Sequence, residues 1–215
     1  MLIKLSPMAD ITMACSRLGR TCREVHVVAT GGECKELLIW MDREWDAEYT
    51  VHAVELPHEY PSAKAATFQF LPSEEQAIGQ TGTSGPPPTG HPEYIFEPGK
   101  ALMKAGAFNL ISTRFSVAKL GKSTHYYTFD GDDTAETLKS LGKVYRIMTW
   151  EPLDKRSIKA AGKAFPKAEV TARNIPMDTD SLRKKLGITS GDDAHIFGLK
   201  SDKLGNLLLC CQRVF

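Results

Sequence analysis

The chain has 215 residues, of which 42% are hydrophobic and 25% are charged, and its formal net charge at pH 7 is +1. These values are typical of a globular protein and exclude a strongly acidic or histone-like chain. No run approaches the roughly 18 apolar residues of a membrane-spanning helix, and Pro7 interrupts the first apolar residues too early for a secretion signal. We therefore expect no membrane partner. The five cysteines form no C-x-x-C pair, so we expect no disulfide framework and no zinc knuckle, and a cytoplasmic location.

Charge is distributed unevenly along the chain. Residues 1–92 carry a net charge of −5, residues 93–150 carry +2, and residues 151–215 carry +4. Such an asymmetry can mark a part that binds nucleic acid. A set of solvated faces accounts for the basic C-terminal part equally well, because nucleic-acid-binding domains are usually more basic than this.

The first third of the chain alternates strand and helix signals. Residues 2–5 predict a short strand, and Asp10 can cap a helix that ends at Gly19. Buried or alternating apolar residues predict three further strands: 25–29, 37–41 and 49–56. We expect the last two to form a hairpin through the charged segment between them, at the edge of an α/β sheet.

Residues 72–92 differ from both flanks because glycine and proline dominate their second half. This composition predicts a linker. Glycine-rich segments can bind phosphate, but this one lacks the features of a phosphate-binding loop. No Lys-Ser/Thr pair follows it, no predicted strand precedes it, and three prolines interrupt the glycines.

The remaining two segments each mix strands with helices. Residues 93–150 predict the order β-α-β-α-β, with elements at 94–96, 98–107, 124–129, 133–141 and 144–150. Residues 151–215 predict a basic helix, a strand, a helix capped by Asp178 and ended by Gly187, and a hairpin, with the other elements at 155–164, 168–171, 195–199 and 207–211.

Spacing alone defines no catalytic or metal-binding constellation, so catalytic and cofactor-binding residues are unknown at this stage. No H-x-x-x-H or G-x-S-x-G pattern occurs. His26 and His52 lie in apolar strands, where a hydrogen-bonded core histidine is more common than a ligand, and we predict no metal. Cys210 and Cys211 end an apolar strand and are expected to pack in the core.

The segment Asn174-Ile175-Pro176-Met177 is similar in shape to the Asn-Pro-Pro-aromatic loop of amino-methyltransferases, in which the Asn amide and a backbone carbonyl would hold the target amine. Here Ile175 and Met177 replace the first proline and the aromatic residue. An exposed turn is therefore favoured, from which Arg173 and Asn174 could contact phosphate or base edges.

Basic side chains in the last segment, together with Asn174, form the candidate RNA-binding set. Lys155, Lys159 and Lys163 fall on one helical stripe. Positive charge near a helix C-terminus also complements the helix dipole, so a solvated face stays an alternative. The full candidate set is Arg173, Asn174, Arg183, Lys184, Lys185, Lys159 and Lys163.

Three groups of motifs, in order, resemble one family and cover nearly the whole chain except the linker. The first resembles the C-terminal part of a bacterial class I S-adenosylmethionine-dependent methyltransferase domain: Lys4–Met8 with Asp10-Ile11, Arg23–Val28 and Glu33–Leu38. The second resembles the small ferredoxin-like domain that follows it: Tyr94–Pro98, Met103–Phe108 and Thr124–Tyr127. The third resembles the closing THUMP-like domain: Ala168–Pro176 and Leu182–Leu186.

This resemblance implies an α/β plus α+β fold with four segments: the late strands of a Rossmann-like sheet in 1–71, a linker in 72–92, a ferredoxin-like domain in 93–150 and a THUMP-like domain in 151–215. It implies methyl transfer to RNA, either tRNA or rRNA, with S-adenosylmethionine held upstream of these residues in a longer parent. The chain is then a fragment, inactive alone and without bound cofactor. Ser6, Pro7 and Met8 would lie near the edge of the methyltransferase site.

Two other hypotheses stay open. In the first, the chain is a non-enzymatic structural or protein-interaction module, which would self-associate through an exposed sheet edge. In the second, it is a complete small enzyme, which would bind S-adenosylmethionine, and we expect no such binding.

Overall fold

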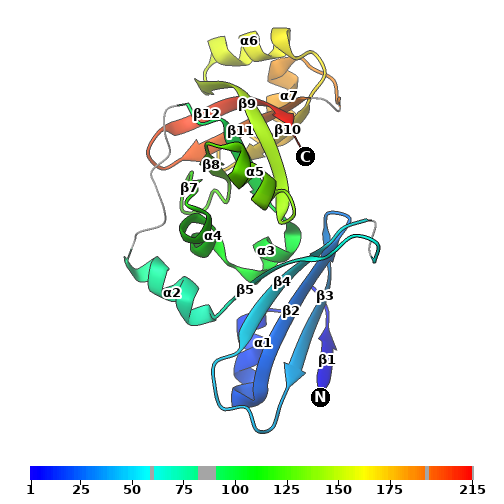
Figure 1. Cartoon of the computed structure of the whole chain (residues 1–215). Coiled ribbons are helices and arrows are strands. Elements are labelled where there is room, and N and C mark those ends of the chain that lie inside the picture. Colours follow the sequence, from blue (N-terminus) through cyan, green and yellow to red (C-terminus); the bar gives the residue numbers. More distant parts are fainter. Residues whose placement is uncertain (59–60, 82–90, 192–193, 215) are drawn as a thin grey trace. The chain divides into compact units, whose positions relative to one another are not determined.

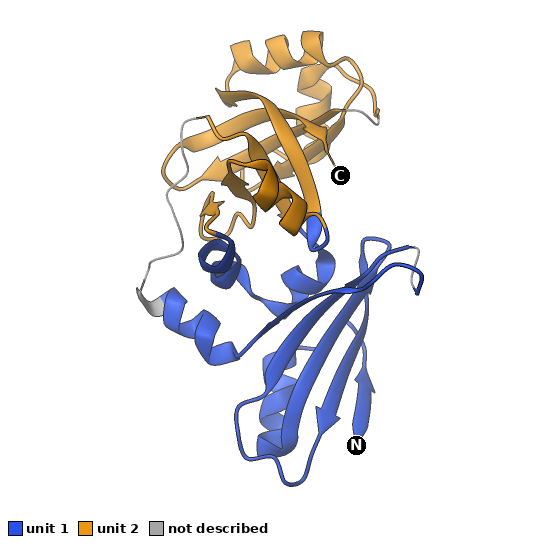
Figure 2. Cartoon of the chain, in the orientation of Figure 1, with its two compact units in different colours: residues 1–84, 98–115, 140–142 blue, residues 85–97, 116–139, 143–215 orange. Residues whose placement is uncertain are grey.

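A computed structural model describes residues 1–58, 61–81, 91–191 and 194–214. The chain divides into two compact units, coloured separately in Figure 2. Unit 1 comprises residues 1–84, 98–115 and 140–142, and unit 2 comprises residues 85–97, 116–139 and 143–215. Among the described residues, none of the helices combines the length and apolarity that crossing a membrane requires.

Unit 1 contains a five-stranded mixed sheet with the order β1-β3-β2-β4-β5 (Figure 1). β2 and β4 pair in parallel, and the other neighbours pair antiparallel. The strands are β1 (Leu2–Leu5), β2 (Cys22–Thr30), β3 (Glu33–Met41), β4 (Thr50–Leu56) and β5 (Ala66–Phe70).

The predicted hairpin between residues 37–41 and 49–56 is wrong. β3 instead turns back on β2 through Gly31 and Gly32, which have φ angles of 59° and 77°, and Thr30 pairs with Glu33 across the turn. Two successive left-handed residues give the turn that matches the twist of paired strands, and glycine adopts them without steric cost. β2 therefore lies between β3 and β4.

One face of this sheet is buried and the other is partly open. Val25, Val27 and Ala29 are fully buried, and the intervening residues of β2 are only half-buried. The helices α1 (Ile11–Leu18) and α3 (Lys100–Ala105) pack against these strands, with the 3-10 turn η1 (Gly19–Thr21) after α1. Asp10 caps α1 as predicted, because its Oδ1 accepts a hydrogen bond from Met13 N at 2.7 Å.

A buried carboxylate ties α3 to the sheet. Glu55 on β4 accepts a hydrogen bond from Ala101 N at 2.7 Å, at the first turn of α3. Burial raises the pKa of the Glu55 carboxyl, and the backbone hydrogen bonds of α3 oppose that rise. A carboxylate at this position also compensates the partial positive charge of the helix N-terminus.

The predicted linker is wrong over residues 72–81, which form the helix α2 (Pro72–Thr81). α2 packs against α4 (Phe108–Phe115), a helix that the sequence did not predict. The Glu75 carboxylate of α2 accepts hydrogen bonds from Asn109 N and Leu110 N, each at 2.8 Å. It satisfies amides that the first turn of α4 leaves without partners, and this contact stabilises both helices. Residues 82–90 of the expected linker lie outside the described residues.

Unit 2 is built on a seven-stranded sheet with the order β10-β11-β12-β9-β6-β8-β7. Its strands are β6 (Tyr94–Pro98), β7 (Ala118–Lys119), β8 (Tyr127–Phe129), β9 (Gly142–Pro152), β10 (Glu169–Arg173), β11 (Ala194–Ser201) and β12 (Gly205–Arg213). Its helices are α5 (Asp132–Leu138), α6 (Lys155–Ala164) and α7 (Thr179–Leu186).

The predicted segments 93–150 and 151–215 therefore share one sheet. The 11-residue strand β9 pairs with β12 and is the neighbour of β6. Residues 98–115 belong instead with unit 1. Pairing through β9 therefore joins the strands of the two predicted segments in one sheet.

Both faces of the unit 2 sheet carry a hydrophobic core. One core lies under α6 and α7 and contains Leu208 and Cys210 of β12. The other contains Leu207, Leu209 and Cys211, which point the opposite way. The predicted packing role of Cys210 and Cys211 is confirmed, because both are at most 1% exposed.

Candidate functional site

The helices α6 and α7 meet near their C-terminal ends (Figure 1). A Cβ atom placed on Gly162 would lie 2.0 Å from the Leu186 carbonyl oxygen, so the two backbones touch at this point. Lys163 follows Gly162, and Lys185 precedes Leu186. The structure therefore brings together parts of the two basic helices that the sequence could treat only separately.

The lysines at this junction face solvent. Lys159, Lys163, Lys184 and Lys185 are all exposed. A helix C-terminus carries partial negative charge, which favours basic side chains there. Because two such ends lie together, the region gathers positive charge that is available to an anionic partner.

A surface hollow of about 540 Å³ adjoins the end of α6. Phe165, Pro166 and Lys167, the residues directly after α6, line one side of it. Met148 of β9 lines another part and is 54% exposed. No pattern in the sequence marks the hollow, because its lining comes from several segments that are distant in sequence.

Arg183 differs from its lysine neighbours. It is half-buried and lies between two carboxylates, with Glu169 Oε2 at 3.9 Å and Asp180 Oδ1 at 3.4 Å. Its charge is thus compensated within unit 2. Of the predicted Arg183-Lys184-Lys185 run, the two lysines are the residues best exposed to a ligand.

Arg173 and Asn174 lie at the opposite end of the β10–α7 pair from Lys184 and Lys185. Ala172 N, near the end of β10, donates to Thr179 Oγ1 at the start of α7, at 3.2 Å. The contact between Arg183 and Glu169 joins the opposite ends of the same two elements. β10 is five residues long and rises roughly 3.3 Å per residue, so its length separates Arg173 and Asn174 from Lys184 and Lys185. The two predicted groups therefore do not form one continuous patch.

Asn174 has a structural role. Its backbone is left-handed, with φ of 57°, a conformation that asparagine tolerates better than most residues. The side-chain Nδ2 donates to Ser123 O at 2.9 Å and to Thr124 Oγ1 at 3.1 Å. The amide that was predicted to contact RNA is therefore already bonded to the loop before β8.

Ser6, Pro7 and Met8 form a tight turn between β1 and α1. Ala9 N donates to Ser6 O at 2.9 Å, and Met8 N donates to Ser6 Oγ at 3.2 Å. Met8 is 87% exposed. A cavity of about 310 Å³ lies beside the start of α1, lined in part by Asp10, Tyr49, Glu75 and Lys104.

The described residues do not fit S-adenosylmethionine as a class I methyltransferase would hold it. Such a site needs a glycine-rich turn between a strand and a helix, with an acidic residue placed for the ribose. No strand–helix connection in the described ranges has a glycine-rich turn, and the β1–α1 connection reads Ser6-Pro7-Met8-Ala9-Asp10.

The chain contains two recognisable domain types. The model of a ferredoxin-like domain family matches residues 94–133, and that of a THUMP domain-like family matches residues 142–213. These matches confirm the ferredoxin-like and THUMP-like parts of the resemblance. The THUMP-like match begins with β9, earlier than the predicted boundary at residue 151.

A solved structure extends the similarity to the whole chain. It is the crystal structure of a "putative methyltransferase from Porphyromonas gingivalis W83", which is 28% identical to this chain and superposes with a TM-score of 0.85. The similarity covers 100% of this chain and 51% of that one, so this chain spans about half the length of the related protein. None of the curated proteins compared with the chain matches it.

Proposed function

We propose that the chain is the RNA-binding C-terminal portion of an S-adenosylmethionine-dependent RNA methyltransferase, and that it does not bind the cofactor by itself. The exposed lysines at the junction of α6 and α7, beside the hollow after α6, carry this proposal. The match of residues 142–213 to a THUMP-like domain supports RNA as the partner, and the half-length similarity to the Porphyromonas gingivalis protein supports the methyltransferase context.

In this proposal, charge and shape act together. Lys163, Lys184 and Lys185 contact phosphates of a tRNA or rRNA, which position the RNA without reading its sequence. The hollow lined by Phe165 and Met148 accepts an unstacked base, since single-stranded RNA is commonly recognised by stacking on aromatic side chains. Unit 1 corresponds to the late strands of the Rossmann-like methyltransferase sheet, with Ser6–Met8 near the edge of its site.

The test is RNA affinity as a function of salt, measured by fluorescence anisotropy with a labelled tRNA. The Lys163→Ala/Lys185→Ala variant should bind more weakly at every salt concentration, and the slope of log K against log salt should decrease by about one for each phosphate that a lysine no longer neutralises. Lys200→Ala/Lys203→Ala is a matched control, because both residues are exposed lysines of unit 2 that belong to neither α6 nor α7. The control should retain the parent affinity.

Two results would contradict the proposal. One is the absence of RNA binding at low salt, and the other is an equal loss of affinity in both double variants. Calorimetric titration with S-adenosylmethionine tests the cofactor part separately, and we expect no heat of binding to this chain.

A second candidate function is a protein-interaction module. Leu2 on β1 pairs with Trp40 on the neighbouring strand, and their exposed fractions are 64% and 40%. Apolar side chains at a sheet edge favour association with another strand. This candidate predicts self-association in sedimentation at increasing concentration, reduced by Leu2→Lys, without affinity for RNA.

A further inference from the structure

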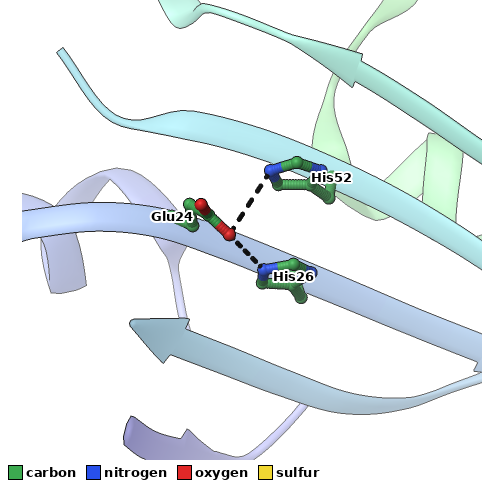
Figure 3. Close-up of side chains that lie close together, drawn as sticks. All are labelled: Glu24, His26 and His52. Carbon is green, nitrogen blue, oxygen red and sulfur yellow. Dashed lines mark hydrogen bonds and ion pairs between the residues drawn. The ribbon is translucent and has the colours of Figure 1, made fainter. Parts of the chain in front are cut away.

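Two histidines and a glutamate meet on the half-exposed face of the unit 1 sheet. β2 and β4 run parallel, and their register places His26 directly beside His52. Glu24 lies two residues before His26 and therefore on the same face of β2. Figure 3 shows the carboxylate of Glu24 directed at one nitrogen of each imidazole ring.

The distances within the cluster are those of a group that can share one ion. His26 Nε2 lies 2.9 Å from Glu24 Oε2, and His52 Nε2 lies 3.7 Å from the same oxygen. Two ligand atoms that each lie about 2.0–2.1 Å from a tetrahedral Zn²⁺ are about 3.3 Å apart. The two observed distances bracket that separation, and the three ligand atoms lie within 4.8 Å of one another.

His52 leaves one coordinating atom without a partner. Its Nε2 is buried and has no hydrogen-bond partner among the described residues, whereas Nε2 of His26 is bonded to Glu24. A buried polar atom without a partner costs about 1–3 kcal/mol. A metal ion would satisfy this nitrogen and the carboxylate together.

The rings must rotate for both to bind one ion. The two imidazoles stack with centroids 4.4 Å apart and planes 5° apart, and both Nε2 atoms lie on the side of the Glu24 carboxylate. Because an imidazole nitrogen binds a metal in the plane of its ring, an ion shared by both nitrogens requires the two rings to turn out of this parallel stack. Arg23 is the nearest cation described, with Nε 4.0 Å from the other oxygen of Glu24. Its guanidinium donates to Asp42 Oδ2 at 2.9 Å and lies over the Trp40 ring, so its charge is compensated on that side.

We propose that Glu24, His26 and His52 form a site for a divalent transition-metal ion of the zinc class. Two imidazole nitrogens and one carboxylate oxygen suit Zn²⁺, whereas Mg²⁺ and Ca²⁺ prefer sites made of oxygen ligands. Three protein ligands leave a fourth position for water or for a donor from another molecule. The side chains are 16% to 32% exposed, so the open face of the sheet gives an ion access.

The experiment is a calorimetric titration of the whole chain with ZnCl₂ at pH 7 in a reductant without thiols. We expect one Zn²⁺ per chain, no displacement by excess Mg²⁺, and a higher Tm with Zn²⁺ present. His52→Ala should weaken Zn²⁺ binding at least about 10-fold, since an inner ligand matters at least as much as the outer partners whose loss costs 10- to 100-fold. Glu24→Gln keeps the side-chain volume and tests the same ligand set if His52→Ala does not fold.

Matched controls separate this site from other donors. His91→Ala removes an exposed histidine outside the cluster, and Cys34→Ser removes a half-buried thiol. Both variants should bind Zn²⁺ as the parent chain does. Co²⁺ provides a spectroscopic readout, because thiolate ligation adds a charge-transfer band that nitrogen and oxygen ligands do not give. No binding of Zn²⁺, or equal binding in the parent, His52→Ala and Glu24→Gln, would overturn the proposal.

Discussion

The two sheets of the molecule bury their strands in different ways. In β2 of unit 1, buried residues alternate with half-buried ones, so one face packs and the other meets solvent. In β12 of unit 2, five consecutive residues from Leu207 to Cys211 are at most 3% exposed, because each face has its own core. Both β2 and β12 are rich in apolar residues, yet only β12 is buried on both of its faces.

The difference changes what a histidine does. His195 of unit 2 stacks on Phe197 with centroids 4.0 Å apart, and its Nε2 is 2.8 Å from Thr171 Oγ1. Burial lowers the pKa of His195 to about 4, which keeps the ring neutral. His26 and His52 stack in a similar way on the open face of unit 1, beside a carboxylate. The same residue type thus serves packing in one sheet and is available for ligand binding in the other.

The largest expected effect is a loss of stability when the packing of α6 against α7, which covers one face of the unit 2 sheet, is disrupted. In Gly162→Val, the new side chain would meet the Leu186 carbonyl, a backbone atom that cannot move alone. We expect the free energy of unfolding to fall by about 3 kcal/mol, the upper part of the range for overpacking. Urea unfolding followed by circular dichroism measures it.

Ala160→Val is the matched control for Gly162→Val, because Ala160 is an exposed residue of the same helix. Its cost should stay below about 0.7 kcal/mol, the difference in helix propensity. An equal loss in both variants would mean that the contact between α6 and α7 does not support the sheet.

Local chemistry made much of the fold predictable. Asp10 and Asp178 cap their helices by accepting from Met13 N and Ser181 N, and Gly187 ends α7 in the left-handed conformation. These signals act within a few residues, so they can be recognised without tertiary structure. The predicted start and stop signals of α1 and α7 are therefore found in the structure.

Long-range placement was not predictable in the same way. Strand order in unit 1 depended on which of two turns joined adjacent strands, and the Gly31-Gly32 turn decided it. The cluster at His26 and His52 arises from parallel register between residues far apart in sequence. Likewise, Arg173 and Lys185 are near in sequence but lie at opposite ends of the antiparallel pair formed by β10 and α7. Their separation in space could therefore not be predicted from the sequence.

Low pH should destabilise the fold through the buried histidine of unit 2, His195. The pKa of His195 is about 4 in the folded chain and 6.5 as the ordinary value, so the unfolded chain binds the proton first as the pH falls. Stability contributed by the neutral ring is complete above about pH 6.5 and is lost progressively toward pH 4. We expect His195 to contribute a loss on the order of 2 kcal/mol over that interval, taken as the difference between the parent chain and a variant without the ring in urea unfolding at pH 7.0, 5.5 and 4.5.

Substitution isolates the contribution of His195. Glu97 and Glu169 act to raise the pKa of His195, and Lys143 acts with burial to lower it. His195→Gln keeps a polar group near Thr171 without a titrating ring, so its stability should depend less on pH than that of the parent chain. His91→Gln, at an exposed position, should leave the pH dependence unchanged. A parallel pH profile for parent and His195→Gln would contradict the assignment.

The smallest expected effect comes from a substitution in the turn after β10. It tests whether Asn174 stabilises the fold or contacts RNA. Asn174→Ala removes two hydrogen bonds to the loop before β8 and places alanine in a left-handed conformation. We expect a loss of about 1–2 kcal/mol in the free energy of unfolding, from the hydrogen bonds and the backbone strain together. RNA affinity at a temperature where the variant stays folded should equal that of the parent, because the amide already donates within unit 2. If stability is unchanged while RNA affinity falls, Asn174 contacts RNA directly and the basic surface extends to both ends of the β10–α7 pair.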